Sequence, residues 1–498
     1  MRIRPSTALS LATRPSFLTR ASSRTQSLPS EVLHICQDHL PTYTRLQYST
    51  SPSPAPVPAS QLQFGQPVHE THPHILAPGE LTPSITAQEY HDRRTALASS
   101  LPTNALAILP SSSIQWRSGA VFHPFRQNSN FLYLTGFSEP ESLAVIQKTG
   151  PQPDDFLFHL YVRPKNPSLE QWSGPWSGVQ AAQDVFNADV ADDIAQSERL
   201  LSSLLQSASK IYTDADLPSV FPNTRRRSAQ TVAPLKPLLN ALRIVKSPSE
   251  LAAMRHAGKV SGRALTSAMR REWTHEKDLA TYLNHAFTAD GLDGPAYVPV
   301  VAGGSRANMI HYVQNNQILS RDKLVLVDAG GEYGTYISDI TRTWPVNGKF
   351  QPAQRDLYEA VLRVQRMGVA LCRANNGGLS LDRIHRATEA ALTTELRALG
   401  FTMDRPADLE GVFAHHVGHY VGLDVHDCPG YGRNVALKKG MCVTIEPGVY
   451  VPDDERYPKH FRGMGIRIED SVAVDDKGPT VLTVEAVKEV VDVEALRN

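Results

Sequence analysis

Two aspartates lie in a stretch whose pattern predicts a β-hairpin. An apolar run ends at Asp328, a glycine-rich break follows, and a β-branched and aromatic run then carries Asp339. If Tyr333-Gly334 is the two-residue turn, the glycine supplies the positive φ that such a turn needs, and Asp328 directly faces Asp339. A turn around Gly330-Gly331 would break this pairing. Two bare carboxylates about 5 Å apart repel each other, so the pairing predicts a positive charge between them.

Three more residues that could bind a metal lie in or beside later strand patterns. His419 lies in the segment HHVGHYVGLDVHD, Glu446 in VTIEPGVY and Glu469 in GIRIED. A carboxylate among apolar strand residues needs a partner or a metal, because an unpaired buried charge is costly. Taken singly, a glutamate in a strand is more often ion-paired, and a lone histidine is more often structural. Together with Asp328 and Asp339, however, these residues favour one shared site.

These segments resemble one known family. The phrases VDAG, SDITRTWPVNG, GLDVHD, TIEPG and GIRIED are similar to those of the pita-bread metallopeptidases and, within them, of the aminopeptidase P branch. The resemblance covers essentially all of residues 80–498, and HPFRQNSNFLYLTGFSEPES and SPSELAAMRHAGKVS resemble the longer, two-domain members. It implies an α/β (α+β) fold, in which a creatinase-like N-terminal α/β domain precedes a pita-bread catalytic domain. It also implies five metal ligands, none of them substituted: Asp328, Asp339, His419, Glu446 and Glu469.

The chemistry of these five residues agrees with that assignment. Oxygen-rich sites with one imidazole favour harder divalent ions such as Mn²⁺ over thiophilic ones. Four carboxylates neutralise two such cations, and a two-metal centre lowers the pKa of its water and clamps the attacking and carbonyl oxygens of a hydrolysis. We therefore expect two divalent metal ions, Mn²⁺ by preference. A bridging hydroxide would attack the carbonyl of the first residue of a peptide and so remove that single residue.

Further histidines fall where the family places residues that line the site. The resemblance implies that His311, His415 and His426 polarise the scissile carbonyl or contact the substrate, tasks that a neutral imidazole can perform. Together with Glu446, these histidines are the expected catalytic residues. His416 stands where the family has a small residue, and we expect it to be structural or to support the side chains that bind the metal.

A basic residue accompanies the last ligand. Arg467 lies two residues before Glu469 and therefore on the same face of its strand. We expect Arg467 to orient a ligand carboxylate or to contact the substrate, with simple ion pairing as the alternative. The basic run at 225–227, by contrast, is typical of a solvated loop rather than of a binding patch.

The first half of the chain has the alternating pattern of a compact α/β domain, without a catalytic cluster. Thr86 and Glu89 form a capping-box pattern that opens a helix through about Ala98. The other expected elements are strands at 106–109, 130–137, 142–146 and 156–162 and a helix at 192–207.

The second half begins sharply at Ser247-Pro248-Ser249-Glu250. This segment combines an N-cap serine, a proline in the first turn and a glutamate at the third position, so a helix begins there. Amphipathic spacing predicts the elements that position the site: helices at about 247–270, 276–290, 352–374 and 381–399, and a strand at 298–302. Strands are also expected around His419, Glu446 and Glu469.

Composition places the chain among globular proteins with two domains and extensions. It has 498 residues, of which 41% are hydrophobic and 20% charged. A net charge of zero argues against a nucleic-acid-binding surface. The sequence has no uninterrupted apolar run of about 18 residues, so we do not expect a membrane-spanning helix. Residues 1–48 are rich in arginine and serine and poor in acidic residues, which is typical of a mitochondrial transit peptide, with a disordered tail as the alternative. We expect a Pro/Ser-rich linker at 49–79, the N-terminal domain at 80–245 and the catalytic domain at 246–498.

The expected function is that of a mitochondrial two-metal aminopeptidase of the Xaa-Pro type, in the matrix or on the matrix side of the inner membrane. It resembles the intermediate-cleaving peptidases, which trim one residue from the N-termini of imported proteins. The resemblance also implies a homo-oligomer, either a dimer or a tetramer. Three alternatives remain: an Xaa-Pro dipeptidase (prolidase), a methionine aminopeptidase and a non-catalytic binding module of the same fold. The long N-terminal domain disfavours the second, and five intact ligands disfavour the third.

Overall fold

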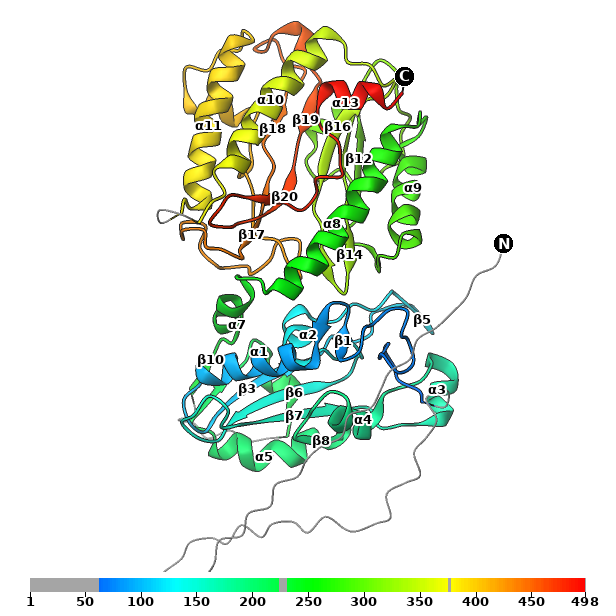
Figure 1. The fold of residues 1–498 in the computed structure, drawn as a ribbon, viewed down its shortest axis with the longest axis vertical. Helices are drawn as coiled ribbons and strands as arrows, with labels where there is room; N and C mark the ends of the chain where they lie inside the picture. The colour runs from blue at the N-terminus through cyan, green and yellow to red at the C-terminus, as the bar shows by residue number, and fades with distance from the viewer. Residues whose placement is uncertain (1–61, 224–230, 375–377, 498) are drawn as a thin grey trace, which may run out of the picture. The chain divides into compact units, whose positions relative to one another are not determined.

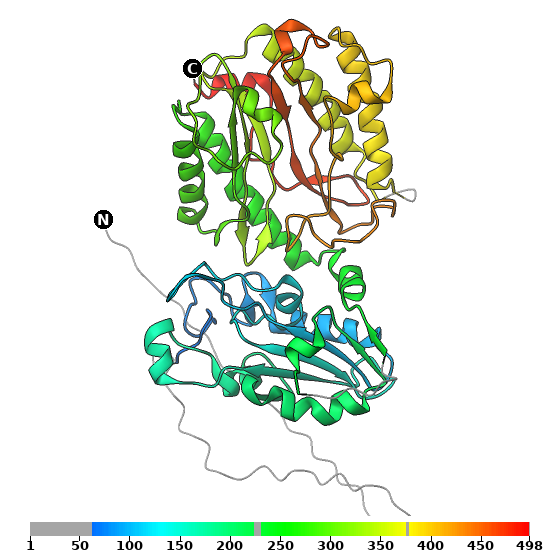
Figure 2. The ribbon, with the colours of Figure 1, turned by 180° about the vertical axis from the view of Figure 1, so that it is seen from behind.

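Residues 62–223, 231–374 and 378–497 are described by the computed structural model (Figures 1 and 2). The predicted transit peptide, the basic run at 225–227 and the first part of the predicted linker lie outside these residues. Sheets and helices alternate along the chain, so the predicted mixed α/β fold is confirmed. Within the described residues, no helix is both long enough and apolar enough to cross a membrane.

A six-stranded sheet forms the centre of the N-terminal half. Its strand order is β10-β9-β3-β6-β7-β8; β6 is antiparallel to β3 and β7, and the other pairs are parallel. Its strands are β3 (Ala105–Pro110), β6 (Leu143–Lys148), β7 (Phe156–Val162), β8 (Val190–Asp193), β9 (Lys210–Tyr212) and β10 (Thr231–Ala233). Two small hairpins add β1 (Glu80–Thr82), β2 (Ile85–Thr86), β4 (Trp116–Ser118) and β5 (Val121–Phe122).

Helices cover both faces of this sheet, with α1 and α5 on opposite sides (Figure 1). The helices are α1 (Ala87–Ser99), α2 (Ser129–Thr135), α3 (Pro167–Ser173), α4 (Gly178–Asp184), α5 (Ser197–Ser207), α6 (Leu217–Val220) and α7 (Lys236–Arg243). Side chains alternate between the faces of a strand. Ala107 of β3 therefore packs in one cluster with Leu97 of α1, whereas Ile108 packs in another with Leu201 of α5.

The strand expected at 130–137 is wrong, because this segment forms the helix α2. The Asn128 side chain accepts hydrogen bonds from the backbone N–H groups of Asn130 (3.0 Å) and Phe131 (3.1 Å), which caps the helix. Gly136 ends it in the left-handed region, with φ 67°. Six of its seven residues are buried, so its apolar run had the same pattern as a buried strand.

The helix expected at 192–207 is right only from Ser197 onwards. Residues Val190–Asp193 instead pair with β7 as the edge strand β8. The other predicted elements of this half, namely the helix that Thr86 caps and the strands at 106–109, 142–146 and 156–162, are confirmed to within a few residues.

The C-terminal half contains small antiparallel sheets packed against long helices. The sheets have the orders β12-β13-β16, β11-β14-β15, β17-β20-β21 and β18-β19. Their strands are β11 (Gly294–Pro295), β12 (Val300–Gly303), β13 (Leu324–Asp328), β14 (Gly331–Tyr333), β15 (Tyr336–Ile337), β16 (Thr341–Pro345), β17 (Cys442–Ile445), β18 (Gly448–Tyr450), β19 (Gly465–Arg467), β20 (Asp470–Ala473) and β21 (Thr480–Val481). The helices are α8 (Pro248–Met269), α9 (Glu276–Ala289), α10 (Pro352–Ala370), α11 (Leu381–Ala398), α12 (Pro406–Glu410) and α13 (Val490–Ala495).

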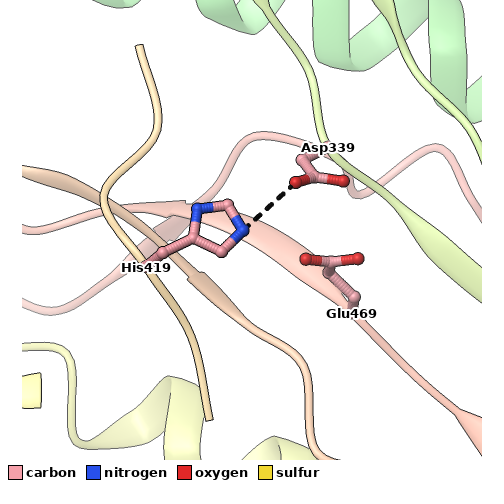
Figure 3. Close-up of side chains that lie close together, drawn as sticks. All are labelled: Asp339, His419 and Glu469. Carbon is pink, nitrogen blue, oxygen red and sulfur yellow. Dashed lines mark ion pairs between the residues drawn. The ribbon is translucent and has the colours of Figure 1, made fainter. Parts of the chain in front are cut away.

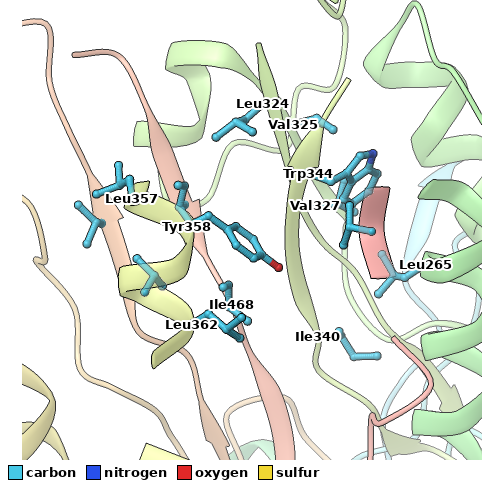
Figure 4. Close-up of a cluster of buried hydrophobic side chains, with 14 of the residues drawn as sticks. Leu265, Leu324, Val325, Val327, Ile340, Trp344, Leu357, Tyr358, Leu362 and Ile468 are labelled. Carbon is cyan, nitrogen blue, oxygen red and sulfur yellow. The ribbon is translucent and has the colours of Figure 1, made fainter. Parts of the chain in front are cut away.

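All four long helices predicted here are present, and α8 begins at the predicted capping box. The Ser247 side chain accepts a hydrogen bond from the Glu250 N–H (3.1 Å), and the Glu250 carboxylate accepts one from the Ser247 N–H (2.7 Å). A cluster of buried apolar side chains packs between the strands and helices of this half (Figure 4). In it, Tyr358 of α10 lies in the same cluster as Trp344 and Ile468, which belong to segments that carry candidate ligands.

The predicted hairpin is present, but its register differs from the expectation. β14 and β15 pair across a turn of Gly334 and Thr335, whose φ values are 55° and 67°. Asp328 therefore faces Thr341 rather than Asp339. The expected turn is wrong by one residue, which shifts every partner by two positions. Because side chains alternate with a period of two, Asp339 stays on the same face as Asp328.

The same hairpin explains one glycine. A Cβ atom added at Gly330 would lie 1.8 Å from the carbonyl oxygen of Ser338, so one strand would have to move. We expect Gly330→Ala to lower the free energy of unfolding by about 2–3 kcal/mol in urea denaturation. Gly400→Ala is the control, because Gly400 has a φ of 87° but open space around it and should cost only about 1 kcal/mol. If both variants lost the same free energy of unfolding, the close approach of Gly330 to the Ser338 carbonyl would not contribute to stability.

Candidate metal centre

Three side chains that could hold a metal ion meet at one point of the C-terminal half (Figure 3). One ligand atom from each of Asp339, His419 and Glu469 lies within 4.8 Å of the other two. Asp339 precedes β16, His419 lies in the loop before β17, and Glu469 lies between β19 and β20. Three segments that are distant in sequence thus bring their donor atoms together.

The other two expected ligands adjoin this group. Glu446 Oε1 lies 3.5 Å from His419 Nε2, and Asp339 Oδ2 lies 3.4 Å from the same nitrogen. Asp328 joins through Tyr297, whose hydroxyl lies 2.7 Å from Oδ1 of Asp328 and 2.7 Å from Oδ1 of Asp339. The structure therefore brings all five residues into one cluster.

Hydrogen bonds between neighbouring strands hold these residues in place. The Thr341 carbonyl accepts a hydrogen bond from the Glu469 N–H (3.0 Å), and the Thr341 hydroxyl donates to Glu469 Oε2 (2.6 Å). Across the cluster, the Thr444 hydroxyl accepts from the His419 N–H (3.1 Å) and donates to Glu446 Oε1 (3.3 Å). Two threonines thus orient one carboxylate each.

The His419 ring offers one nitrogen to the carboxylates. Its Nδ1 donates to the Tyr420 carbonyl at 3.0 Å, which leaves Nε2 directed at Asp339 and Glu446. Burial by itself lowers the pKa of His419, but the hydrogen bond to Asp339 and the charge of Glu446 raise it to about 9. The carboxylates thus attract positive charge to this nitrogen.

The four carboxylates of the cluster outnumber the positive charges of His419 and Arg467 beside them. Burial raises the pKa of Glu469 well above its ordinary value, and the charges of Asp339 and Glu446 add to this. Burial likewise raises the pKa of Glu446 to about 7, although His419 opposes it. Burial also raises the pKa of Asp328, against the charge of Arg467. A divalent cation would remove this penalty, so the donor set fits the metal that the sequence implies.

The position of Tyr297 points the same way. Its hydroxyl has one proton, yet it lies at hydrogen-bond distance from a carboxylate oxygen of Asp328 and of Asp339. It can donate to one of them only, so the other oxygen needs a proton or a cation. An oxygen-rich cavity of this kind suits a hard divalent ion.

Each of the three guanidinium nitrogens of Arg467 donates a hydrogen bond to a neighbouring side chain. Its Nη2 donates to Asp328 Oδ2 (2.7 Å), its Nη1 to the Tyr450 hydroxyl (2.8 Å) and its Nε to the Thr341 hydroxyl (2.9 Å). Its exposed fraction is 1%. These contacts hold the guanidinium of Arg467 against the Asp328 carboxylate, and its expected roles stay predictions.

Two of the expected catalytic histidines border the cluster. The His426 ring lies 4.4 Å from the His419 ring, centroid to centroid, and burial followed by the charge of His419 lowers the pKa of His426. His415 donates from Nδ1 to the His416 carbonyl (2.9 Å) and accepts at Nε2 from the Tyr450 hydroxyl (2.8 Å). Burial lowers the pKa of His415 to about 4, so both rings are neutral at physiological pH.

The remaining histidines lie farther out. His311 is exposed on its loop, and the adjacent Tyr312 packs in one apolar cluster with Tyr450. His416 stacks on His385 at 4.4 Å, and its Nδ1 bonds the Gly418 carbonyl at 2.8 Å. These contacts support the structural role expected of His416.

Sequence reasoning missed the residues that orient the ligands, namely Tyr297, Thr341, Thr444 and Tyr450. Strand alternation could have found two of them, because Thr341 and Thr444 each lie two positions from an expected ligand. Tyr297 precedes Asp328 by 31 residues, and no local pattern connects the two.

Comparisons with known proteins match two parts of the chain to families. Residues 252–476 match the family described as "Metallopeptidase family M24", and residues 90–212 match "Aminopeptidase P, N-terminal domain". The second match falls on the sheet of the N-terminal half, and the first contains all five candidate ligands.

Individual relatives match most of the chain. Intermediate cleaving peptidase 55 of Saccharomyces cerevisiae is 41% identical over 452 residues, which are 87% of this chain and 88% of that protein. Human Xaa-Pro aminopeptidase 3 is 37% identical over 471 residues, or 89% and 92% of the two chains. Among solved structures, that of Icp55 from Saccharomyces cerevisiae without its N-terminal 58 residues has a TM-score of 0.79 at 40% identity, and the match covers 84% of this chain and 99% of that one.

Proposed function

The chain belongs to metallopeptidase family M24, and we propose that it is an aminopeptidase of the Xaa-Pro type that removes a single N-terminal residue. The observation that carries this proposal is the cluster of four carboxylates and one imidazole around His419. A relative without catalytic activity would not need to keep these metal ligands, so their presence favours an active enzyme.

We assign the metal to the five clustered residues, Asp328, Asp339, His419, Glu446 and Glu469. Two divalent ions fit four carboxylates, and Mn²⁺ is our choice because hard oxygen donors predominate. When bound, such ions lower the pKa of a water molecule and polarise the scissile carbonyl.

In this proposal, the side chains around the metal ligands orient a ligand, accept a proton and line the substrate site. Arg467 favours the ionised form of Asp328 and holds its carboxylate in place through a 2.7 Å contact. Glu446 would accept a proton from the attacking water; its Oε1 lies 3.5 Å from His419 Nε2 and its Oε2 lies 3.9 Å from His415 Nδ1. The neutral rings of His415 and His426, with His311 from its loop, line the place where the substrate carbonyl and backbone would lie.

We place this activity in mitochondria, in the matrix or on the matrix side of the inner membrane. There the enzyme would trim the N-termini of imported proteins after their presequences have been cleaved. The arginine- and serine-rich, acid-poor composition of residues 1–48 supports this location.

We also propose a homo-oligomer, a dimer or a tetramer. The hairpin of β4 and β5 supports this, because Trp116, Val121 and Phe122 are each more than half exposed there. Apolar side chains gathered on one hairpin are typical of a surface that another chain covers.

Peptides with different first residues test the proposed function. We expect the purified protein with Mn²⁺ to release only the first residue from peptides that begin with Tyr, Leu or Phe before Ser or Ala, as followed by mass spectrometry. A chelator should stop the release, and added Mn²⁺ should restore it. Activity on Xaa-Pro dipeptides alone would indicate a prolidase instead. Binding of fewer than one Mn²⁺ per chain at saturation would favour a non-catalytic binding module.

A further inference from the structure

One buried carboxylate fastens the loop that carries His311. Glu276 is the first residue of α9, and its side chain is 0% exposed although it is charged. It lies outside the metal cluster and has no part in the mechanism described so far. The segment that it contacts, residues 303–317, is called the His311 loop below.

Both oxygens of Glu276 accept hydrogen bonds from this loop. Oε1 accepts from the Gly303 N–H (3.0 Å) and from Arg306 Nε (2.6 Å). Oε2 accepts from the Tyr312 hydroxyl (2.8 Å) and from the Gln317 N–H (3.0 Å). Two of the donors precede His311 in the chain and two follow it, so one carboxylate holds both arms of the loop.

This arrangement uses the whole capacity of the carboxylate. An ionised carboxylate has about four acceptor positions, and all four are taken here. A buried charge is costly unless it is paired and completely hydrogen-bonded, and Arg306 supplies the opposite charge. A hydrophobic residue could fill this position without that cost, but it could not specify the path of the fifteen residues from Gly303 to Gln317.

The loop leads from Glu276 to the metal cluster. Tyr312 is 6% exposed and points into the fold, whereas the adjacent His311 is exposed. Tyr312 packs in one apolar cluster with Tyr450, whose hydroxyl lies 2.8 Å from His415 Nε2 and 2.8 Å from Arg467 Nη1 at the metal cluster. A shift of the loop would therefore move His311 relative to the cluster.

We propose that Glu276 is a positioning residue of the aminopeptidase reaction, whose carboxylate sets the path of the His311 loop and thereby the place of His311. The proposal rests on the proposed function and extends it to a residue that touches neither metal nor substrate. A misplacement of about 1 Å in a group that contacts the substrate can cost about 10²-fold in rate.

Glu276→Gln tests the carboxylate with little change in shape. The glutamine amide can accept at its oxygen, but its NH₂ group would face two of the four donors. We expect kcat/KM to fall about 10- to 100-fold at saturating Mn²⁺. Glu272→Gln is the matched control, because Glu272 pairs with Arg321 at the surface, and its activity should stay within about twofold of the wild type.

A double-mutant cycle shows whether Glu276 acts through His311. If it does, Glu276→Gln should change kcat/KM less than about threefold in a His311→Ala background. The full loss in that background would overturn the proposal, because a general structural defect would then be the cause. Tyr312→Phe removes a single donor and should give a smaller loss in the same direction, so the test survives if Glu276→Gln folds poorly.

Hydrogen exchange gives a reading that does not need activity. In metal-free protein, Glu276→Gln should speed amide exchange in residues 304–317 by about tenfold or more while the middle of α9 keeps its protection. Unchanged exchange in this loop would contradict the proposal even if activity fell. A wild-type protein that cleaves no peptide would refute the proposed function instead, and the exchange result would still report on the loop.

Discussion

Replacing Asp339 by asparagine is expected to abolish hydrolysis, with a loss in kcat/KM of about 10³-fold or more. Asparagine keeps the volume of the side chain but removes a negative charge from the centre of the cluster. Although burial raises the pKa of Asp339, its hydrogen bond with His419 brings that pKa below its ordinary value, so the carboxylate is ionised in the wild type. An amide at this position would offer one weaker oxygen donor, and the affinity for a divalent ion should fall with it.

The fold should survive this change. In the metal-free protein, the relief of repulsion among the carboxylates offsets the loss of the ion pair between Asp339 and His419, so the free energy of unfolding should change by no more than about 1 kcal/mol. Circular dichroism, urea denaturation and metal content would be measured together with peptide release. Asp356→Asn, at an exposed position of α10, is the control and should keep normal activity. Near-normal turnover by Asp339→Asn at subsaturating metal would refute the assignment of Asp339 as a ligand.

Sequence patterns within a single helix predicted the helices whose ends and faces depend only on nearby residues. The capping box at Ser247 and the amphipathic spacing of the four long helices were sufficient, because caps and 3.6-residue periodicity act within a few turns. The segment at 130–137 was mispredicted for the opposite reason. It is buried on nearly all sides, so periodicity cannot separate a helix from a strand there, and the Asn128 cap and Gly136 stop were the only local signs of a helix.

The residues of the candidate site were easier to predict than the strand register that was expected to bring Asp328 opposite Asp339. A one-residue error in the turn moved the partner of Asp328 from Asp339 to Thr341, yet both aspartates stayed on one face because the error shifted partners by an even number. The residue types and their resemblance to a known family were enough to name the five candidates. Tyr297 and Glu276 were beyond reach, because their roles depend on contacts between segments that no local pattern connects.

The largest effect on stability is expected next to the cluster, at Asp470. This residue is 0% exposed and accepts hydrogen bonds from Arg342 Nη2 (2.7 Å), Gln365 Nε2 (2.8 Å) and the Thr483 hydroxyl (2.8 Å), and it pairs with Lys488. Asp470→Ala would leave the buried guanidinium of Arg342 without its counter-charge. We expect the free energy of unfolding to fall by about 3–5 kcal/mol in urea denaturation of the metal-free protein at pH 7.

Asp470 should also contribute to acid sensitivity, and the sign follows from its pKa. Burial alone raises this pKa, but Arg342 and Lys488 lower it from 3.8 to about 2 in the folded chain. A carboxyl whose pKa is lower in the folded state stabilises the fold above its unfolded pKa, and that contribution is lost as the pH falls from about 4 to 2. The shift corresponds to about 2–3 kcal/mol.

Asp470→Asn should therefore remove that much of the pH dependence between pH 5 and pH 2, whereas Asp492→Asn, at an exposed position of α13, should leave it unchanged. An Asp470→Asn curve parallel to that of the wild type would mean that other carboxylates account for the acid sensitivity and that the Arg342 pair is energetically neutral.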